Sequence, residues 1–215
     1  MSSNFNQISL NNISKSILDQ LYDIHFHTYE RKNTGLKRET WESNLKRDYH
    51  LHSRKQLFTY SHLGKDTLID GYIIIAGTHM VQNNHWNKIL EGAAHPQGSY
   101  INSVSAFTEM FYHFLIYAEE MKWNLWGEIS YLHKSIFKLL INFGFSPIDQ
   151  FELANSLCSI FLGAEARYRL QKANSKIFSH RPTQLNTDYS GFIISYEQSV
   201  NCNLIKQNQQ HEYNR

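Results

Sequence analysis

The hydrophobic pattern of the sequence changes its period twice, and this change limits the possible folds more than any single motif does. Residues 14–49 place apolar side chains at intervals of three and four, as amphipathic helices do. Residues 55–76 have the β-branched and aromatic composition of strands, and residues 104–121 return to the helical interval. Helices and strands of this kind must cover one another, so we expect a mixed α/β fold. No internal repeat or Pro- or Gly-rich linker interrupts the chain, so we expect one domain over residues 1–215.

Two helices are expected in the N-terminal part of the chain. Ser14 can cap the first helix, and Gly35 can stop it. The second helix is expected from Arg38 to about Tyr49. The apolar positions expected to face the core are Ile17, Leu18, Leu21, Ile24 and Phe26 in the first helix and Trp41 and Leu45 in the second. The polar residues 1–12 and 204–215 are expected to be loose termini.

A β-hairpin is expected within residues 55–76. A turn at residues 64–66 separates its two strands, and Tyr72–Ile75 has the composition of a central strand. The Asn83-Asn84 pair indicates another turn. After it, residues 86–94 (WNKILEGAA) can form a further strand.

The clearest helix, residues 104–121, directly follows the loop GAAHPQGSYINS, residues 92–103. One face of this helix is apolar and is formed by Phe107, Met110, Phe111, Phe114, Ala118 and Met121. Ser103 and Ser105 are both candidate N-caps. Because unpaired N–H groups and the positive end of the helix dipole meet at such a loop, it can bind a phosphate group. The alternative is a simple turn followed by a serine cap.

The remaining elements alternate in the same way. Residues 123–130 (WNLWGEIS) are expected to form a strand, followed by a helix that Gly144 stops and Pro147 cannot continue. Residues 191–198 indicate a late strand. Residues 156–164 are compatible with either a strand or the start of a helix.

Composition excludes several classes of protein. A formal net charge of +2 and 19% charged residues do not give the basic stripe of a nucleic-acid-binding domain. Basic residues between positions 31 and 55 are mixed with acidic ones and are typical of a solvated face. The chain has neither a signal peptide nor an apolar run near the roughly 20 residues of a membrane span, so a cytoplasmic protein is expected. Cys158 and Cys202 do not form a disulfide scaffold or a zinc ribbon.

The 12 histidines raise the question of a metal site. His25 and His27 stand two residues apart, as do His50 and His52. On a helix, side chains two residues apart diverge, and the second pair is expected in a loop. No HExxH motif and no carboxylate cluster completes either pair, so no metal site is expected. A serine nucleophile is not expected either, because no GxSxG motif occurs.

Two stretches, together with the order of elements, resemble the GNAT acyltransferase family. Residues 130–149 (SYLHKSIFKLLINFGFSPID) resemble the strand and short helix that end in the family's Gly-Phe pair, here Gly144 and Phe145. Residues 93–110 (AAHPQGSYINSVSAFTEM) occupy the place of its pyrophosphate-binding loop. The resemblance spans residues 14–149. It implies a mostly antiparallel mixed sheet with splayed central parallel strands, flanked by helices.

The sequence also departs from the family pattern. The loop has Gln97-Gly98 and Ser99 but no second glycine and no basic residue. Leu140 stands where the family usually has a tyrosine that protonates the departing thiolate, and His133 stands where asparagine is common. Family branches that use acyl carrier protein as donor also depart from the standard loop.

The resemblance implies an N-acyltransferase that moves an acyl group from a thioester to an amine of a small molecule or protein by direct attack. The donor is expected to be acyl-CoA as a co-substrate, or an acyl-carrier protein, with no permanently bound cofactor. No nucleic acid and no membrane span are expected, and the oligomeric state stays open. The alternative is a catalytically inactive binding protein of the same fold.

Site residues follow from the same resemblance. Glu128 is the candidate base, unless it faces solvent or pairs with Lys122 or Lys134. Tyr131 and His133 are candidate acids. The main chain expected to hold the donor is that of Ala94, Gln97, Gly98, Ser99, Tyr100, Ile101, Asn102 and Ser103. The acceptor side is expected to involve Tyr29, Arg31, Trp41 and Glu42.

Overall fold

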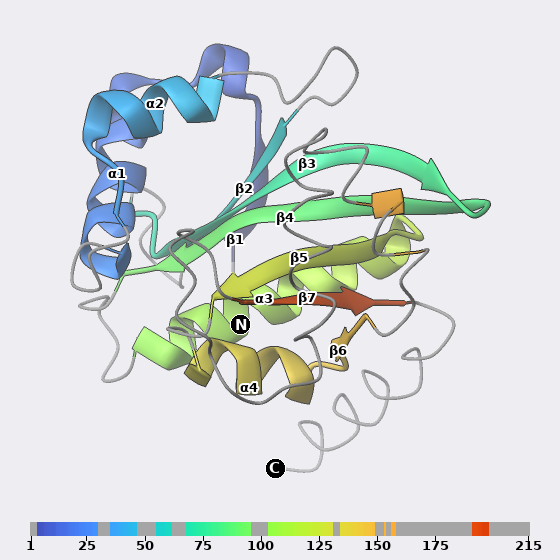
Figure 1. The fold of residues 1–215 in the computed structure, drawn as a ribbon. Coiled ribbons are helices and arrows are strands. Elements are labelled where there is room, and N and C mark those ends of the chain that lie inside the picture. The colour runs from blue at the N-terminus through green and yellow to red at the C-terminus, as the bar shows by residue number, and fades with distance from the viewer. Residues whose placement is uncertain are drawn as a thin grey trace, which may run out of the picture. The chain divides into compact units, whose positions relative to one another are not determined.

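The protein is a mixed α/β structure built on a seven-stranded, mostly antiparallel sheet (Figure 1). The computed structural model describes residues 4–29, 35–46, 55–61, 68–95, 103–130, 134–148, 153, 156–157 and 191–197. The strands follow the order β1-β2-β3-β4-β5-β7-β6. The elements are β1 (Asn4–Ile8), a 3-10 turn η1 (Leu10–Asn12), α1 (Lys15–Tyr29), α2 (Arg38–Lys46), β2 (Lys55–Ser61), β3 (Gly71–Val81), β4 (Asn84–Ala94), α3 (Ser103–Glu120), β5 (Asn124–Ser130), α4 (Lys134–Asn142), β6 (Ser146–Pro147) and β7 (Gly191–Tyr196).

The chain divides into two compact units. The first comprises Met1–Gly77 and Ile89–Glu120, and the second comprises Thr78–Lys88 and Met121–Arg215. The expectation of one domain over the whole chain stays a prediction. None of the helices that the structure describes is long and apolar enough to cross a membrane.

The expectation of a loose N-terminal arm over residues 1–12 is wrong for its described part. Residues Asn4–Ile8 form β1, which pairs antiparallel with β2, from Asn4 opposite Ser61 to Ile8 opposite Leu57. The Phe5 ring stacks on the Phe58 ring with their centroids 5.5 Å apart. Backbone pairing and the contacts of Phe5 with the Phe58 and His113 rings therefore order a mostly polar segment.

Helices α1 and α2 cover one face of the first unit. The Ile17 N–H donates to Ser14 Oγ at 3.3 Å, which confirms the expected cap of α1. The core beneath these helices contains Leu18, Leu21, Ile24, Trp41, Leu45, Leu57, Tyr72, Ile74 and Ala93. Phe26 was expected in this core but is 40% exposed, because it lies 200° around the helix from buried Ile24.

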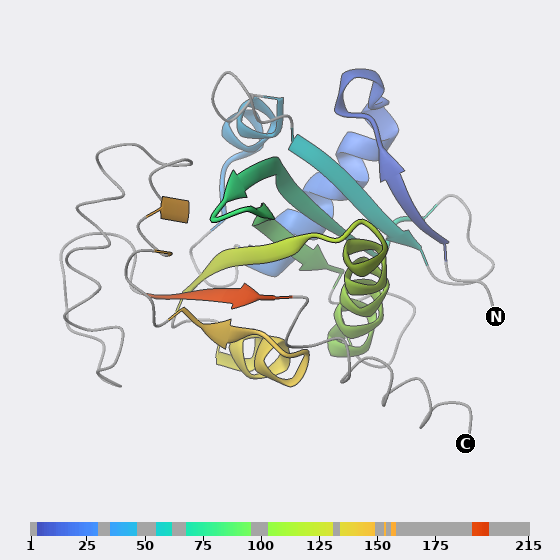
Figure 2. The ribbon, with the colours of Figure 1, turned by 90° about the vertical axis from the view of Figure 1, so that its right-hand side faces the viewer.

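Helix α3 covers the opposite face of the same strands (Figure 2). Leu57 packs under α1 and α2, whereas its neighbour Phe58 meets Phe114 of α3, because successive side chains of a strand point to opposite faces. The expected apolar face of α3 is buried as far as Ala118. Met121 was expected to continue it but is 48% exposed, because α3 ends at Glu120.

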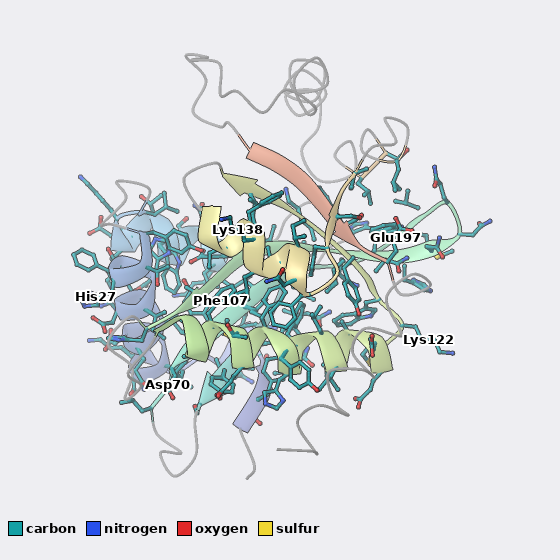
Figure 3. The ribbon with its side chains drawn as sticks, turned by 90° about the horizontal axis from the view of Figure 1, so that it is seen from below. His27, Asp70, Phe107, Lys122, Lys138 and Glu197 are labelled. Atoms are coloured by element: carbon teal, nitrogen blue, oxygen red, sulfur yellow. The ribbon has the colours of Figure 1, made fainter. Side chains whose placement is uncertain are left out.

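Close packing of α3 explains the glycine at position 71, at the start of β3. A Cβ atom added at Gly71 would lie 2.7 Å from Met110 Sδ and 3.0 Å from the Ala93 carbonyl oxygen. At Gly92 an added Cβ atom would lie 3.5 Å from the Phe107 ring, which is labelled in Figure 3. A larger residue at position 71 therefore does not fit without movement, whereas the distance at Gly92 is an ordinary van der Waals contact.

Strands β2 and β3 of the predicted hairpin are present, and the turn expected between them at residues 64–66 lies outside the described residues. Strands β2 and β3 pair antiparallel, with Leu57 opposite Ile74. The turn expected at Asn83-Asn84 lies one residue earlier, because Gln82 and Asn83 have positive φ angles of 49° and 64° and β4 already begins at Asn84. Two successive positive φ angles are typical of the tightest hairpin turns.

In the second unit, α4 ends as the sequence predicts. Gly144 has a φ of 91°, the Gly144 N–H donates to the Ile141 carbonyl, and the Phe145 N–H donates to the Leu140 carbonyl, both at 3.0 Å. This pair of bonds is a Schellman motif, which glycine favours. The predicted late strand is β7, which pairs antiparallel with both β5 and β6. Phe145 packs on Tyr196 of β7 with ring centroids 5.4 Å apart.

Candidate active site

A carboxylate interrupts the otherwise apolar end of β4. Glu91 is followed by Gly92, Ala93 and Ala94 and lies in the first unit, where its side chain is 19% exposed. A partly buried carboxylate is stable only when other groups replace the water that it has lost. The residues around Glu91 come from α1, α2 and β3, so distant parts of the sequence meet at this side chain.

One oxygen of Glu91 is the acceptor of three side-chain donors. His25 Nδ1 lies 2.6 Å from Glu91 Oε1, and Trp41 Nε1 donates to the same oxygen at 3.4 Å. The Tyr72 hydroxyl also donates to Oε1. Hydrogen bonds to a carboxylate oxygen are the stronger kind, so these three donors hold Oε1 in a fixed position. Among the described residues, no side chain or backbone group donates to its other oxygen, Oε2.

The partners of His25 define its tautomer. The backbone N–H of Leu36 donates to His25 Nε2 at 3.0 Å, so this nitrogen carries no proton. The proton therefore resides on Nδ1, which donates it to Glu91. A neutral imidazole, buried and held at both nitrogens, orients the carboxylate and also connects α1 to the segment that precedes α2.

Tyr72 is a permanent donor in this cluster. Burial of its hydroxyl raises the pKa well above the ordinary value of 10.0, and the nearby negative charge of Glu91 raises it further. The phenol therefore keeps its proton over the whole neutral range. It can hold the carboxylate in place, but it is poorly suited to release a proton itself.

Aromatic rings enclose the polar centre. The His25 ring centroid lies 5.0 Å from that of Tyr29, 5.6 Å from that of Trp41 and 6.0 Å from that of Tyr22. Such walls lower the local dielectric constant and strengthen the hydrogen bonds that they enclose. They also suit a small ligand with an apolar part.

Side chains of α1 also bond to the end of β4. The Tyr29 hydroxyl donates to the Gly92 carbonyl at 2.8 Å, and the Thr28 hydroxyl donates to the Ala94 carbonyl at 3.2 Å. The N–H of His95 donates to the carbonyl of Asp70, just before β3. The backbone groups of successive residues in a strand point to opposite edges. Because the backbone of His95 points toward β3, the carbonyls of Gly92 and Ala94 point to the other edge of β4. Helix α1 thus holds the last residues of β4 from that other edge.

Solved structures with a similar fold include several acetyltransferases. An acetyltransferase from Streptococcus agalactiae matches with a TM-score of 0.56 and 12% identity over 91% of this chain and 98% of its own. A probable acetyltransferase from Staphylococcus epidermidis matches with a TM-score of 0.51 and 13% identity over 91% and 98%. A GNAT-family acetyltransferase from Staphylococcus aureus matches with a TM-score of 0.51 and 12% identity over 89% and 98%.

The chain has the GNAT fold. These similarities lie in three-dimensional structure, since no protein-family model matches the sequence and no curated protein is detectably similar to it. The similarity to these solved structures confirms the fold class that the order of elements predicts.

Most of the predicted GNAT site residues lie outside the described part of the chain. This holds for Tyr131, for His133 and for the loop residues Gln97, Gly98, Ser99, Tyr100, Ile101 and Asn102. Ala94 ends β4, and Ser103 begins α3. Glu128 lies in β5 opposite Ile193 of β7, and its side chain is not described. The roles predicted for these residues stay predictions.

The predicted acceptor residues divide into two groups. Tyr29 and Trp41 both lie beside His25, and their assignment to the acceptor side stays a prediction. Glu42 instead pairs with Arg38 at 2.7 Å, and Arg38 also pairs with Asp19 of α1. Arg31 lies outside the described residues.

Sequence reasoning missed Glu91 and His25, although each gave a signal. Glu91 is a lone carboxylate inside an apolar strand, where an unpaired charge would be unstable. His25 follows Leu21 by four residues and therefore shares the buried face of its helix. A search for polar residues on faces predicted to be buried would have selected both.

Proposed function

We propose that the protein is an N-acyltransferase in which Glu91 accepts the proton of the acceptor amine. The observation that carries this proposal is the Glu91 carboxylate, held at Oε1 by His25, Trp41 and Tyr72 on a strand of a GNAT fold. A general base must be ionised and oriented and must still have an accessible lone pair. The three donors to Oε1 orient the carboxylate, and Oε2, which has no partner among the described residues, offers the lone pair.

The reaction joins an amine to an acyl thioester without a covalent enzyme intermediate. The amine nitrogen attacks the thioester carbonyl carbon, a C–N bond forms, and the C–S bond breaks. The nitrogen loses one proton, to Glu91 directly or through water, and the departing sulfur finally gains one. The products are an amide and a free thiol, so no oxidant or reductant is needed.

The donor in this proposal is acyl-CoA, with acyl-carrier protein as the alternative. Amides of residues 97–103 and the end of β4 at Ala94 are the proposed contacts for its phosphates and its thioester. An amine of a small molecule or of a protein is the acceptor. The aromatic rings of Tyr22, Tyr29 and Trp41 favour an acceptor or acyl group with an apolar part.

The decisive experiment compares Glu91→Gln with Glu128→Gln. Each substitution removes one carboxylate charge from a strand and keeps the size of the side chain. With acyl-CoA and a panel of amines, release of free thiol should fall about 100-fold or more in Glu91→Gln, as expected for loss of a general base. Glu128→Gln should retain wild-type turnover. The reverse result would assign the base to Glu128, and equal turnover in all three proteins would exclude both residues.

Donor binding is measured separately by thermal shift with acetyl-CoA, long-chain acyl-CoA and free CoA. A ligand at 100 times its Kd raises the stability by about 2.7 kcal/mol, which gives a clear increase in Tm. Both variants should show the wild-type shift, because neither residue is proposed to contact the donor phosphates. Wild-type protein that shows no shift with any of the three would contradict a CoA donor and direct the assay to acyl-carrier protein.

A non-catalytic binding protein of the same fold is the second candidate. It is favoured by His25, whose two nitrogens both bond within the protein, and by the three donors that already occupy Oε1 of Glu91. In that case Glu91 fixes α1, α2 and β3 to β4 and performs no chemistry. Thiol release by the wild-type protein from neither acyl-CoA nor acyl-carrier protein, together with a marked loss of stability in Glu91→Gln, would support this candidate.

A further inference from the structure

A second polar cluster lies on the side of α1 that does not face Glu91. Asp23 and His27 stand at positions i and i+4 of α1, so their side chains lie one above the other on one face of the helix. His95 directly follows β4 and joins them from a distant part of the sequence. Figure 3 labels His27 on α1. The three side chains belong to the first unit and are 56%, 31% and 21% exposed, respectively.

The distances in this cluster are close to those of a metal site. His95 Nε2 lies 2.9 Å from Asp23 Oδ2, and His27 Nε2 lies 3.4 Å from Asp23 Oδ1. One potential ligand atom from each residue lies within 4.8 Å of the others. Bonds of about 2.0–2.2 Å to a tetrahedral zinc ion place neighbouring ligand atoms about 3.4 Å apart. To complete such an arrangement, the ligand atoms would have to approach one another by at most about 1.4 Å, from within 4.8 Å to about 3.4 Å.

The chemistry of the three ligands selects the class of metal. Two imidazole nitrogens and one carboxylate oxygen suit Zn²⁺ and the other late first-row divalent ions, whereas Mg²⁺ and Ca²⁺ prefer oxygen ligands. The exposure of the cluster leaves the remaining coordination positions to water. An ordinary His–Asp ion pair would need only one imidazole, and here two imidazoles converge on the same carboxylate.

We propose that Asp23, His27 and His95 form a binding site for a divalent transition-metal ion such as Zn²⁺. The ion connects the middle of α1 to the first residue after β4. The same two elements are joined by the bonds from Thr28 to Ala94 and from Tyr29 to Gly92. Metal binding therefore stabilises the contact between α1 and β4, and it does so independently of any acyl-transfer chemistry.

The test uses the full-length protein, first stripped of metal with a chelator, and Zn²⁺ as the probe in calorimetry. The wild-type protein should bind one Zn²⁺ at this site, and His27→Ala, His95→Ala and Asp23→Asn should each bind at least about tenfold more weakly. The matched control is His85→Ala, which removes an exposed histidine near the β3–β4 turn and should bind Zn²⁺ like the wild type. Circular dichroism of the metal-free proteins verifies that every variant folds.

Cobalt gives a spectroscopic readout of the same site. Co²⁺ added to the wild-type protein should produce visible absorption bands of a four- or five-coordinate ion, and His27→Ala should lose them. Zn²⁺ should also raise the Tm of the wild-type protein and of His85→Ala more than that of the three cluster variants. Equal Zn²⁺ affinity in the wild type and in His27→Ala, or no Zn²⁺ binding by the wild type, would overturn the proposal.

Discussion

Two histidines of α1, only two residues apart, have opposite environments. His25 is buried, and its ring bonds to Glu91 through one nitrogen and to the Leu36 backbone through the other. His27 is partly exposed, and its ring nitrogen lies near the Asp23 carboxylate and its ring near that of His95. A separation of two residues corresponds to 200° around a helix, so the pair cannot share one ligand or one role. His25 belongs to the framework of the candidate active site, by which we mean the buried residues His25, Trp41 and Tyr72 that hold Glu91. His27 belongs to the proposed metal site.

The largest expected difference between the two is in stability. His25→Ala leaves the Leu36 N–H without its partner, removes one of the three donors to Glu91 and creates a cavity, so the free energy of unfolding should fall by about 2–4 kcal/mol. His27→Ala in a chelator-containing buffer should change it by less than about 1 kcal/mol, because surface contacts contribute little. Urea denaturation measures both values. If the two variants lost equal free energy of unfolding, the greater burial of His25 would not contribute to stability.

The substitution Tyr72→Phe is a milder test of the framework around His25, because it removes only one hydroxyl group. Tyr72→Phe removes one donor to Glu91 and should lower the stability by about 1–2 kcal/mol at neutral pH. The raised pKa adds a pH dependence, because above about pH 10 the unfolded state loses this proton while the folded state retains it. The stabilisation by Tyr72 is therefore complete below pH 10 and is lost as pH rises through the folded-state pKa.

The measurement compares urea denaturation of the wild type and of Tyr72→Phe from pH 8 to pH 11. The difference in stability between the two proteins should be constant up to about pH 10 and then decrease, by at most about 1.4 kcal/mol per pH unit. Using the difference removes the contribution of the other tyrosines and of the lysines. A difference that grows with pH would have the wrong sign for a buried hydroxyl next to a carboxylate.

The smallest effect is expected at Asp23, on the side of α1 that carries His27. In metal-free buffer Asp23→Asn should change the free energy of unfolding by no more than about 0.5 kcal/mol, because the side chain is exposed and its ion pairs are screened. High salt should reduce even this difference. With Zn²⁺ present the difference should become larger, and thermal denaturation with and without the ion measures the change. An effect in metal-free buffer as large as that of His25→Ala would place Asp23 in the framework instead.

The sequence predicted the fold well where side-chain pattern and local chemistry agree. Ser14 caps α1, Trp41 and Leu45 are buried, and Gly144 ends α4 with a positive φ. In each case the structure of a residue depends on neighbours that are close to it in the sequence. The polar β1 was missed because its order depends on pairing with β2, some fifty residues later. Neither period nor propensity reports such pairing.

The candidate site was harder to predict for the same reason. Glu91 lies on β4, the three side chains that donate to its Oε1 come from α1, α2 and β3, and no short motif contains two of these four residues. The rule that His25 and His27 diverge was correct and excluded a site made from that pair. It could not reveal that His27 meets Asp23 and His95, because His95 lies 72 residues away from Asp23 in sequence.

The pairing of β1 has a consequence for the behaviour of the chain in concentrated solution. β1 is the terminal strand of the sheet, and it covers the edge of β2. Beneath it, residues 57–60 of β2 are all buried and carry Leu, Phe, Thr and Tyr, a combination that promotes cross-β association when its edge is open. The polar side chains of Asn6 and Gln7 lie on the strand that closes this edge. Strand β1 thus limits edge-to-edge aggregation, and protein that lacks this strand would expose an edge prone to pair with its own copies.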